Sequence, residues 1–401
     1  MPIFLFLKQL VDMFYQYKIL DYGMVIFAVF LFGKKVWQDK IYLHLKEFLC
    51  PADFMALVLM CIYAASFLRY PSAYGTFFKI ESCFLLYFLG RVYGREIMRH
   101  GRVLAGAGYL IVYSNFCYRF YQFGCKFIVT GPEETLLGLG GFYFYKTDLA
   151  VGVVIAVLFI YMFSEKKWLK WFTIIPICGY MVFYSGARMI KLVMAAEYFL
   201  ILMRELEIRR HFEIKLKEKY VLWIMGAGTF FVLLFFVVLQ FFPFEYVENT
   251  WHVETGLGSF LENLMHSRQI VWWELFQYFS DQSLFTRLFG IDLETVYLHN
   301  SLRISAHSMY LKQMYAVGYT GCFLFLGFLA YIFKGLCKET DRNLQYIVLI
   351  LWIMLLGAGL TVESLESTQM SWFPMLFSGM ILSAGSNKDQ SGECEKESVT
   401  A

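Results

Sequence analysis

Arg188, Arg268 and His307 are the residues of this sequence whose types and positions most favour chemistry. Arg188 begins an apolar stretch, Arg268 precedes two tryptophans, and His307 lies just before another apolar stretch. A guanidinium is costly at the edge of an apolar layer unless it is paired or solvated, and it can donate two parallel hydrogen bonds to one phosphate. An imidazole titrates near neutrality and can take a proton from a hydroxyl group. These types favour phosphate binding and proton transfer.

Each of these side chains also has a purely structural explanation. Arg188 fits a side chain that reaches toward lipid headgroups, Arg268 fits a solvated loop charge, and His307 fits a structural residue at the end of a span. Lys146 is either an interfacial lysine or a phosphate contact, and Asp148 is favoured as the N-cap of the helix that follows. Position alone leaves these alternatives open.

Carboxylates form a weaker pattern. Glu363 and Glu366 are typical either of acid–base residues or of a solvated connection between two apolar stretches. Glu133 and Glu134 are adjacent, and adjacent residues on a helix do not face one another. No acidic metal-binding motif is predicted, and neither a metal nor a cofactor is expected.

The apolar composition indicates that membrane helices position these residues. The chain has 401 residues, of which 59% are hydrophobic and 20% aromatic, and its mean hydropathy is +0.54. Several apolar stretches reach the roughly 20 residues that a helix needs to cross about 30 Å of hydrocarbon. Continuous apolar runs without period-2 alternation favour helices over a barrel. We therefore expect an all-α, polytopic integral membrane protein.

Charge and cysteine usage exclude other classes. The net charge is +3, and no dense basic tract exists outside the loops between spans, so a nucleic-acid partner is excluded. The nine cysteines lie mostly inside apolar runs without a CxxC pair, which argues against disulfides and a zinc site. Charges at Lys8, Asp12 and Lys18 interrupt the N-terminal stretch, so we expect no removable signal peptide.

Hydropathy predicts about 11 transmembrane helices, within a range of 10 to 12. The first span is the least distinct, because residues 1–32 fit either one tilted helix or a short surface helix followed by a span. The expected spans are 19–33, 51–68, 76–93, 102–119, 148–163, 168–185, 187–204, 220–242, 309–333, 344–361 and 370–384.

The distribution of basic residues predicts the orientation. One set of connections carries more than twice as many lysines and arginines as the other, and the positive-inside rule makes that set cytoplasmic. The expected organisation is N-terminal helices over 1–119, a first outer loop over 120–147, central helices over 148–242 with a cytoplasmic basic loop at 204–219, a long outer loop over 243–308, C-terminal helices over 309–384 and a cytoplasmic polar tail over 385–401.

The long outer loop is expected to contain an amphipathic helix. Within 256–279, apolar residues recur broadly at helical spacing, at Phe260, Leu264, Ile270, Trp273 and Phe276. We expect this helix to lie on the outer membrane face with its tryptophans at headgroup depth.

Four segments together resemble the O-antigen ligase and polymerase family of integral membrane glycan-transfer proteins. The resemblance covers about the middle and C-terminal two-thirds of the chain, and the histidine segment is the most specific, with Tyr310, Leu311, Gly318 and Gly321 after His307. The sequence has Ser308 where the family usually has asparagine after the histidine. The four segments are GFYFYKTDLA at 141–150, SGARMIKLVM at 185–194, RQIVWWELFQYFSDQSLFTRLFGID at 268–292 and HSMYLKQMYAVGYTG at 307–321.

The resemblance implies a metal-independent glycosyltransferase of the bacterial plasma membrane with its site on the outer face. Its donor is a glycan on undecaprenyl diphosphate, with Arg188 and Arg268 on the diphosphate and His307 activating the acceptor. Lys146 and Tyr310 are implied as further substrate contacts. Other expected partners are membrane lipids and polysaccharide-assembly membrane proteins.

Three functions stay open from the sequence. The first is polymerisation of lipid-linked repeat units into a surface polysaccharide, and the second is ligation of the glycan to a lipid or protein acceptor. The third is non-enzymatic polysaccharide transport by a flippase. Charges inside the spans are few, and neither an inverted repeat nor a pair of broken spans is evident, which disfavours transport.

Overall fold

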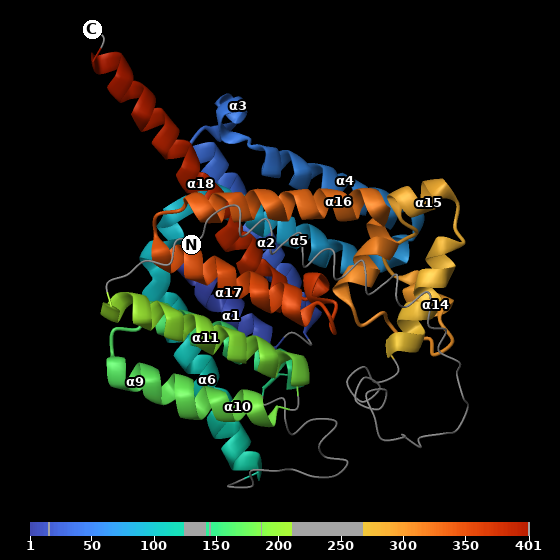
Figure 1. Cartoon of the computed structure of the whole chain (residues 1–401), viewed down its shortest axis with the longest axis horizontal. Helices are drawn as coiled ribbons and strands as arrows, with labels where there is room; N and C mark the ends of the chain where they lie inside the picture. Colours follow the sequence, from blue (N-terminus) through green and yellow to red (C-terminus); the bar gives the residue numbers. More distant parts are fainter. Residues whose placement is uncertain (15–16, 124–141, 144–145, 186, 211–267, 400–401) are drawn as a thin grey trace.

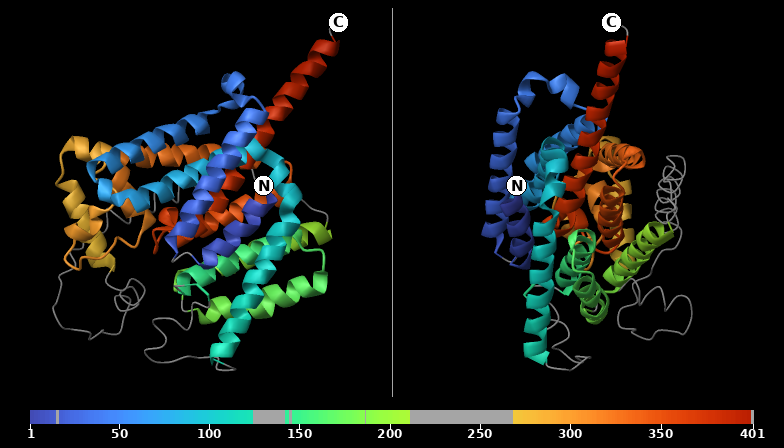
Figure 2. Two further views of the ribbon diagram at one scale, coloured as in Figure 1. Left: turned by 180° about the vertical axis from the view of Figure 1, so that it is seen from behind. Right: turned by 90° about the vertical axis from the view of Figure 1, so that its left-hand side faces the viewer.

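The part of the chain that the structure describes is all helical. The computed structural model describes residues 1–14, 17–123, 142–143, 146–185, 187–210 and 268–399. The helices pack into one bundle, with the C-terminal part of α18 extending beyond it (Figures 1 and 2). They are α1 (Pro2–Met13), α2 (Lys18–Gln38), α3 (Leu45–Phe48), α4 (Pro51–Arg69), α5 (Tyr74–Tyr93), α6 (Gly101–Phe123), α8 (Lys146–Phe163), α9 (Lys167–Phe172), α10 (Gly179–Tyr184), α11 (Arg188–Arg210), α14 (Arg268–Ser280), α15 (Leu284–Phe289), α16 (Met309–Lys338), α17 (Arg342–Ala358) and α18 (Thr368–Val399).

Short helical turns join these helices. Among the described residues, five are 3-10 turns, and the turn between α9 and α10 is a π turn. They are η1 (Ile41–Leu43), η2 (Pro71–Ala73), η3 (Gly94–His100), the π turn η4 (Thr173–Cys178), η5 (Thr295–His299) and η6 (Ser364–Glu366).

Most of the spans expected from hydropathy coincide with helices, and three expectations after residue 32 differ from the structure. The expected span 220–242 lies outside the described residues. The span 168–185 is not one regular helix, because Pro176 lies inside the π turn between α9 and α10 and has no N–H for the helical ladder. The polar tail expected after 384 continues as helix in α18.

Residues 1–32 form two helices, so the expectation of one tilted helix is wrong. Neither does the first lie on the surface, since Phe4, Leu5, Lys8 and Asp12 of α1 are all buried. The Lys8 ammonium pairs with Asp12 and stands 4.6 Å from the ring centre of Trp372 in α18. The buried pair compensates two charges that burial alone would penalise.

The close approach of α5 and α18 forms the centre of the bundle. A Cβ at Gly90 would stand 1.9 Å from the Leu376 carbonyl oxygen, and a Cβ at Gly379 would stand 2.1 Å from that of Tyr87. Only glycine permits this approach at either position, because any Cβ there would overlap the backbone of the other helix.

Two helices in the described part of the chain are long and apolar enough to cross a membrane. They are α4 and α16, whereas residues 147–163 and 342–358 form apolar helices that are shorter. A helix of 19 residues is about 28 Å long, close to the hydrocarbon thickness of a bilayer. These helices indicate membrane association.

One end of the bundle, here called the basic end, collects paired arginines. Arg91 donates from Nε and Nη2 to the two Asp53 oxygens, each at 3.1 Å, and Asp53 also accepts from the Cys50 backbone N–H at 2.7 Å. Arg95 pairs with Glu339 at 3.0 Å, and Arg342 pairs with Glu207 at 2.6 Å. These ion pairs connect α4 with α5, η3 with the C-terminal end of α16, and α11 with the start of α17. Basic residues counted for orientation therefore also have structural partners here.

Candidate functional site

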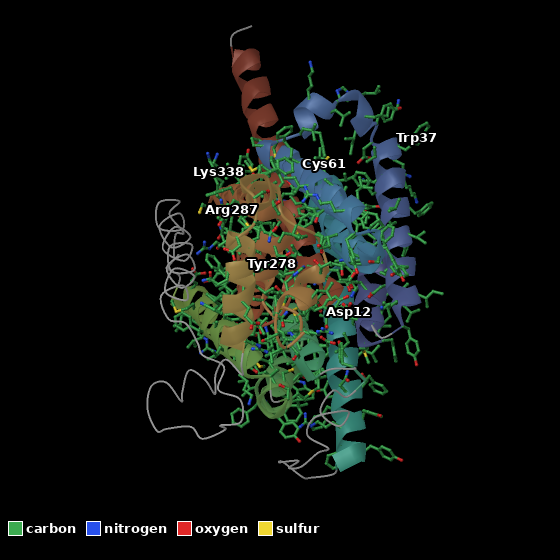
Figure 3. The ribbon with its side chains drawn as sticks, turned by 90° about the vertical axis from the view of Figure 1, so that its right-hand side faces the viewer. Asp12, Trp37, Cys61, Tyr278, Arg287 and Lys338 are labelled. Atoms are coloured by element: carbon green, nitrogen blue, oxygen red, sulfur yellow. The ribbon has the colours of Figure 1, made fainter. Side chains whose placement is uncertain are left out.

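The opposite end of the bundle, here called the loop end, carries α14, α15 and the start of α16 (Figure 1). Figure 3 views this end, with Tyr278 of α14 near its centre. The residues of the resemblance segments that the structure describes converge here. The segment that holds His307 lies among them.

Residues 305–309 are fixed by contacts on both sides of His307. The Trp272 indole N–H donates to the Ala306 carbonyl at 2.7 Å, and the Ser305 hydroxyl donates to Glu363. On the other side, the Met309 backbone N–H donates to the Gly359 carbonyl at 2.8 Å. α14, the α17–α18 loop and the end of α17 therefore all hold this segment.

His307 itself adopts a left-handed backbone conformation with φ of 46°. Such a conformation costs a non-glycine residue of the order of 1–2 kcal/mol and persists only where the surroundings enforce it. The neighbours Ala306 and Ser308 are buried, whereas the His307 side chain is exposed. The segment thus presents one imidazole outward from an otherwise fixed turn.

Charges surround the exposed imidazole. Partial desolvation by the surrounding protein lowers the pKa of His307 from its usual value. The Glu363 carboxylate raises the pKa of His307, whereas the positive charges of Arg268 and Lys312 lower it further. The imidazole is therefore neutral at pH 7, which is the form that accepts a proton.

A partly buried ion cluster contacts this segment and helps to fix it. The Lys312 ammonium, one turn into α16, contacts Glu363 at 3.0 Å and Glu366 at 2.8 Å, and its side chain is only 7% exposed. Since Glu363 also accepts from Ser305, the cluster links the histidine segment, α16 and η6. We call Lys312, Glu363 and Glu366 the Lys312 cluster.

The two carboxylates of the Lys312 cluster differ. Burial alone would raise the pKa of Glu363, but Lys312 and the Ser305 hydroxyl hold it below its usual value. Burial raises the pKa of Glu366 to about 7, against the attraction of Lys312. Glu363 is therefore the permanent anion, and it is also the one that acts on His307.

α14 positions Arg268, and the side that it buries differs from the expected one. Val271, Trp272, Leu275 and Phe279 pack against Leu311, Met314 and Tyr315 of α16 and against Val296 and Ala306. The expected apolar positions Trp273 and Phe276 are only half-buried, Phe260 and Leu264 lie outside the described residues, and the Ile270 side chain is not described. Contact with α16 buries the Trp272 indole inside the protein, and the depth of the tryptophans in a membrane stays a prediction.

Arg268 is the first residue of α14 and is half-buried. Desolvation lowers the pKa of its guanidinium, which nevertheless stays charged at any ordinary pH. Within the described residues no side chain or backbone group forms a hydrogen bond or ion pair with it. Its charge acts on His307, so the structure brings these two predicted residues into one electrostatic environment.

A break in α16 anchors the outer-loop segment around Gly290. Gly318 has φ of 65° inside the helix, and the Ile291 backbone N–H donates to the Tyr315 carbonyl at 2.7 Å beside this break. A Cβ on Gly290 or Gly318 would stand within about 2.5 Å of the other segment's backbone. Glycine is therefore required at both positions, and it lets two of the resemblance segments interlock.

The helices that begin with the other predicted basic residues also start at the loop end. Val193, in the second turn of α11, lies against Gly357, two residues before the Gly359 carbonyl that binds Met309. Gln369 of α18 donates to the Asp148 carbonyl in the first turn of α8 at 2.7 Å. α11 begins at Arg188 and α8 at Lys146, but their side chains lie outside what the structure describes.

Tyr310 was expected to contact the substrate, and Asp148 was expected to be the N-cap of the helix that follows. The Tyr310 hydroxyl donates its hydrogen bond to the Leu356 carbonyl at 2.8 Å, inside the bundle, and not to a group outside it. Asp148 lies in the first turn of α8 and not before it, because the helix begins two residues earlier. The N-cap expectation for Asp148 is therefore wrong, although an acidic side chain still suits a first helical turn.

Lys312 is a residue of the site that the sequence did not predict. A lysine inside an apolar stretch is a signal for a paired functional or structural site, and its partners here come from a loop more than 50 residues away. Glu363 and Glu366 were expected to be either acid–base residues or solvated. The structure shows them partly buried and paired with Lys312.

The arrangement combines an exposed neutral base with an arginine whose donors have no partner among the described residues. Such a pair can take a proton from a bound hydroxyl and hold a nearby anion. In the part of the chain that the structure describes, no group of three or more histidines, cysteines or carboxylates could hold a metal ion.

We expect Arg268→Gln and Glu363→Gln to shift the titration of His307 in opposite directions. Arg268 lowers its pKa, so removing that charge should raise it, whereas removing the Glu363 carboxylate should lower it. Diethyl pyrocarbonate modifies the neutral imidazole, and its rate at His307 against pH, read by peptide mass spectrometry, measures each shift. Shifts of the same sign in both variants would contradict the electrostatic assignment.

Comparisons with known proteins add no assignment. Neither the family models nor the curated proteins that were searched match the sequence.

Proposed function

We propose that this chain is a multi-pass plasma-membrane protein whose loop end faces outward. Two membrane-length helices and the overall apolar composition support insertion in a membrane. The lysines and arginines collected at the basic end support the orientation. The helices that coincide with the expected spans would cross the bilayer together.

The same protein, we propose, polymerises oligosaccharide repeat units carried on undecaprenyl diphosphate. The observation that carries this proposal is the exposed His307, held in a left-handed turn beside Arg268. His307 has a strained backbone conformation that its surroundings enforce, and it presents a proton acceptor next to a cation. Such a residue is more typical of a functional site than of a purely structural turn. The resemblance of the same segments to glycan polymerases and ligases gives the substrate class.

The chemistry requires a base and a site for developing negative charge. An acceptor hydroxyl attacks the anomeric carbon, the bond from that carbon to the phosphate oxygen breaks, and the lipid diphosphate leaves with the bonding electrons. His307 takes the hydroxyl proton. Arg268 and Arg188 hold the phosphate oxygens, where charge increases most in the transition state.

Replacing Arg268 with lysine should lower turnover about tenfold to a hundredfold. Lysine keeps the charge but loses the planar fork, and charge-assisted hydrogen bonds to phosphate are worth about 1.5–3 kcal/mol. The assay uses purified protein with undecaprenyl diphosphate-linked repeat units and scores laddered products. Arg303→Lys, an exposed arginine of the same loop, is the matched control and should stay at the wild-type rate.

This assay also separates the alternatives. Transfer of single glycans to an added lipid or protein acceptor, without a ladder, would replace polymerase by ligase. Equal turnover of Arg268→Lys and wild type would remove Arg268 from the diphosphate site.

The orientation predicts accessibility at the two ends of the bundle. In a variant without native cysteines, Ser280→Cys in α14 should react with a membrane-impermeant maleimide added to intact cells. Lys338→Cys, exposed at the other end of α16, should react only after the membrane is opened. The reverse pattern would overturn the proposed orientation.

A further inference from the structure

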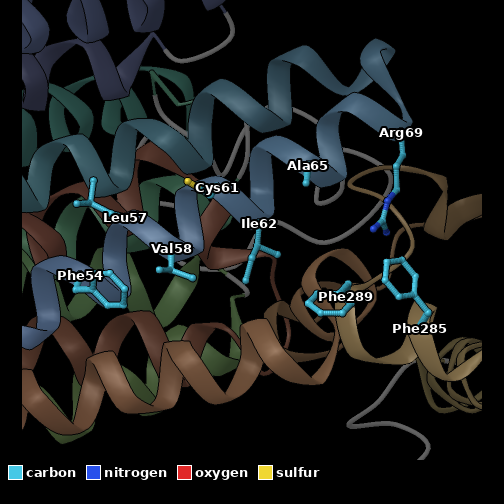
Figure 4. Close-up of a pocket in the computed structure, with 9 residues that line it drawn as sticks. All are labelled: Phe54, Leu57, Val58, Cys61, Ile62, Ala65, Arg69, Phe285 and Phe289. Carbon is cyan, nitrogen blue, oxygen red and sulfur yellow. The ribbon is translucent and has the colours of Figure 1, made fainter.

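An apolar groove of about 520 Å³ runs along one face of α4 (Figure 4). Its volume is within the range typical of ligand sites. Phe54, Val58, Ile62 and Ala65 follow one another along α4, while Phe285 and Phe289 of α15 lie across its outer end. The groove is therefore formed by a membrane-length helix and closed at the loop end by the outer loop.

Arg69 is the one charged side chain among the nine residues that line the groove, and it stands at the loop end. Its Nη1 donates to the carbonyls of Gly290 and Ile291, the segment locked to the α16 break. Nε and Nη2 have no partner among the described residues. A guanidinium has five N–H donors, so Arg69 keeps donors for an anion while its position is fixed.

The length of the groove distinguishes between lipid chains. Phe54 and Arg69 are 15 positions apart, which corresponds to about 22 Å along a helix. Half of a 30 Å hydrocarbon core is about 15 Å, so the groove passes the middle of the bilayer. A phospholipid acyl chain in the outer leaflet ends near the middle, whereas a long polyprenyl chain continues beyond it.

We propose that this groove binds the polyprenyl chain of a polyprenyl phosphate or diphosphate, with the phosphate at Arg69. An apolar channel that ends at a fixed cation matches a ligand with one long apolar chain and an anionic head. The proposal rests on the proposed function for the identity of the chain as a glycan carrier. It places the carrier's head at the same end of the bundle as Arg268 and His307.

Photo-crosslinking to the full-length protein in bilayer nanodiscs tests the proposal without glycan transfer. The probes are a polyprenyl phosphate and the matching polyprenol, each with a diazirine in the chain, and a phospholipid with a diazirine at its acyl terminus. We expect the polyprenyl phosphate to label the peptide containing Phe54, Val58 and Ile62. Equal labelling of that peptide by the phospholipid would overturn the assignment.

Variants separate the two parts of the site. Ala65→Trp should reduce labelling at least tenfold, because the indole fills the groove, whereas Leu68→Trp on the same helix, exposed and outside the lining, should not. Arg69→Gln should remove the preference for polyprenyl phosphate over polyprenol, and Arg69→Lys should retain part of it. Unchanged labelling in Ala65→Trp would refute the groove.

The results remain separable from those of the transfer assay. Labelling as expected without glycan transfer would leave the groove in place and refute the proposed function. Transfer with labelling confined to other helices would support the function and refute the groove.

Discussion

Replacing His307 with glycine should lower glycan transfer about 10²- to 10⁴-fold without loss of folded protein. The rate falls because no base takes the acceptor proton. Folding should not suffer, because φ of 46° is a conformation that glycine adopts without steric cost. The assay is laddered glycan synthesis by purified protein, with the thermal midpoint measured on the same preparation.

Added imidazole supplies the control for this variant. The side chain is exposed, so a free imidazole should enter the vacated position and restore part of the rate in His307→Gly. His100→Ala, in a turn at the basic end, should transfer at the wild-type rate. A wild-type rate in His307→Gly would eliminate His307 as the base.

Replacing Lys312 with methionine should destabilise the protein by about 3–5 kcal/mol. The substitution leaves Glu363 and Glu366 facing one another without their shared cation, in a place where Lys312 itself is 7% exposed. Breaking a buried pair by removing one partner costs this much because a charge stays buried and uncompensated. Thermal unfolding in detergent measures the effect.

Two comparison variants make this test specific. Lys338→Met removes an exposed lysine from the same helix and should change stability by less than about 0.5 kcal/mol. The triple variant Lys312→Met, Glu363→Gln, Glu366→Gln removes all three charges and should recover most of the lost stability. If Lys312→Met unfolds at the wild-type midpoint, the Lys312 cluster is not a structural support.

The helices were largely predictable from the sequence, because continuous apolar runs set their existence and extent. α4, α8 and α17 fall close to their expected ranges. Residues 1–32 were ambiguous because charges such as Lys8 and Asp12 interrupt the N-terminal apolar stretch. Only the structure shows that Lys8 and Asp12 pair with each other in the core, beside the ring of Trp372. Opposite charges four residues apart occur on buried helices and on solvated ones, so the spacing does not distinguish the two.

The candidate site was predictable in part. Arg268 and His307 could be selected by residue type and by their places beside apolar stretches. The buried side of α14 could not, because apolar residues occur on more than one side of it and the contact with α16 decides which is covered. Lys312 could be suspected as a charge in a span, but its carboxylate partners could not be identified from spacing.

The sequence by itself determined that this protein is helical, where most of its helices lie and which residue types could bind phosphate or move a proton. Those properties depend on the local composition and on the spacing of apolar residues along the chain. The tertiary structure decided that Glu363 reaches both Ser305 and Lys312, that Gly290 meets Gly318, and that His307 is held in a left-handed turn. These are contacts between segments far apart in the chain, and their geometry depends on how the helices pack.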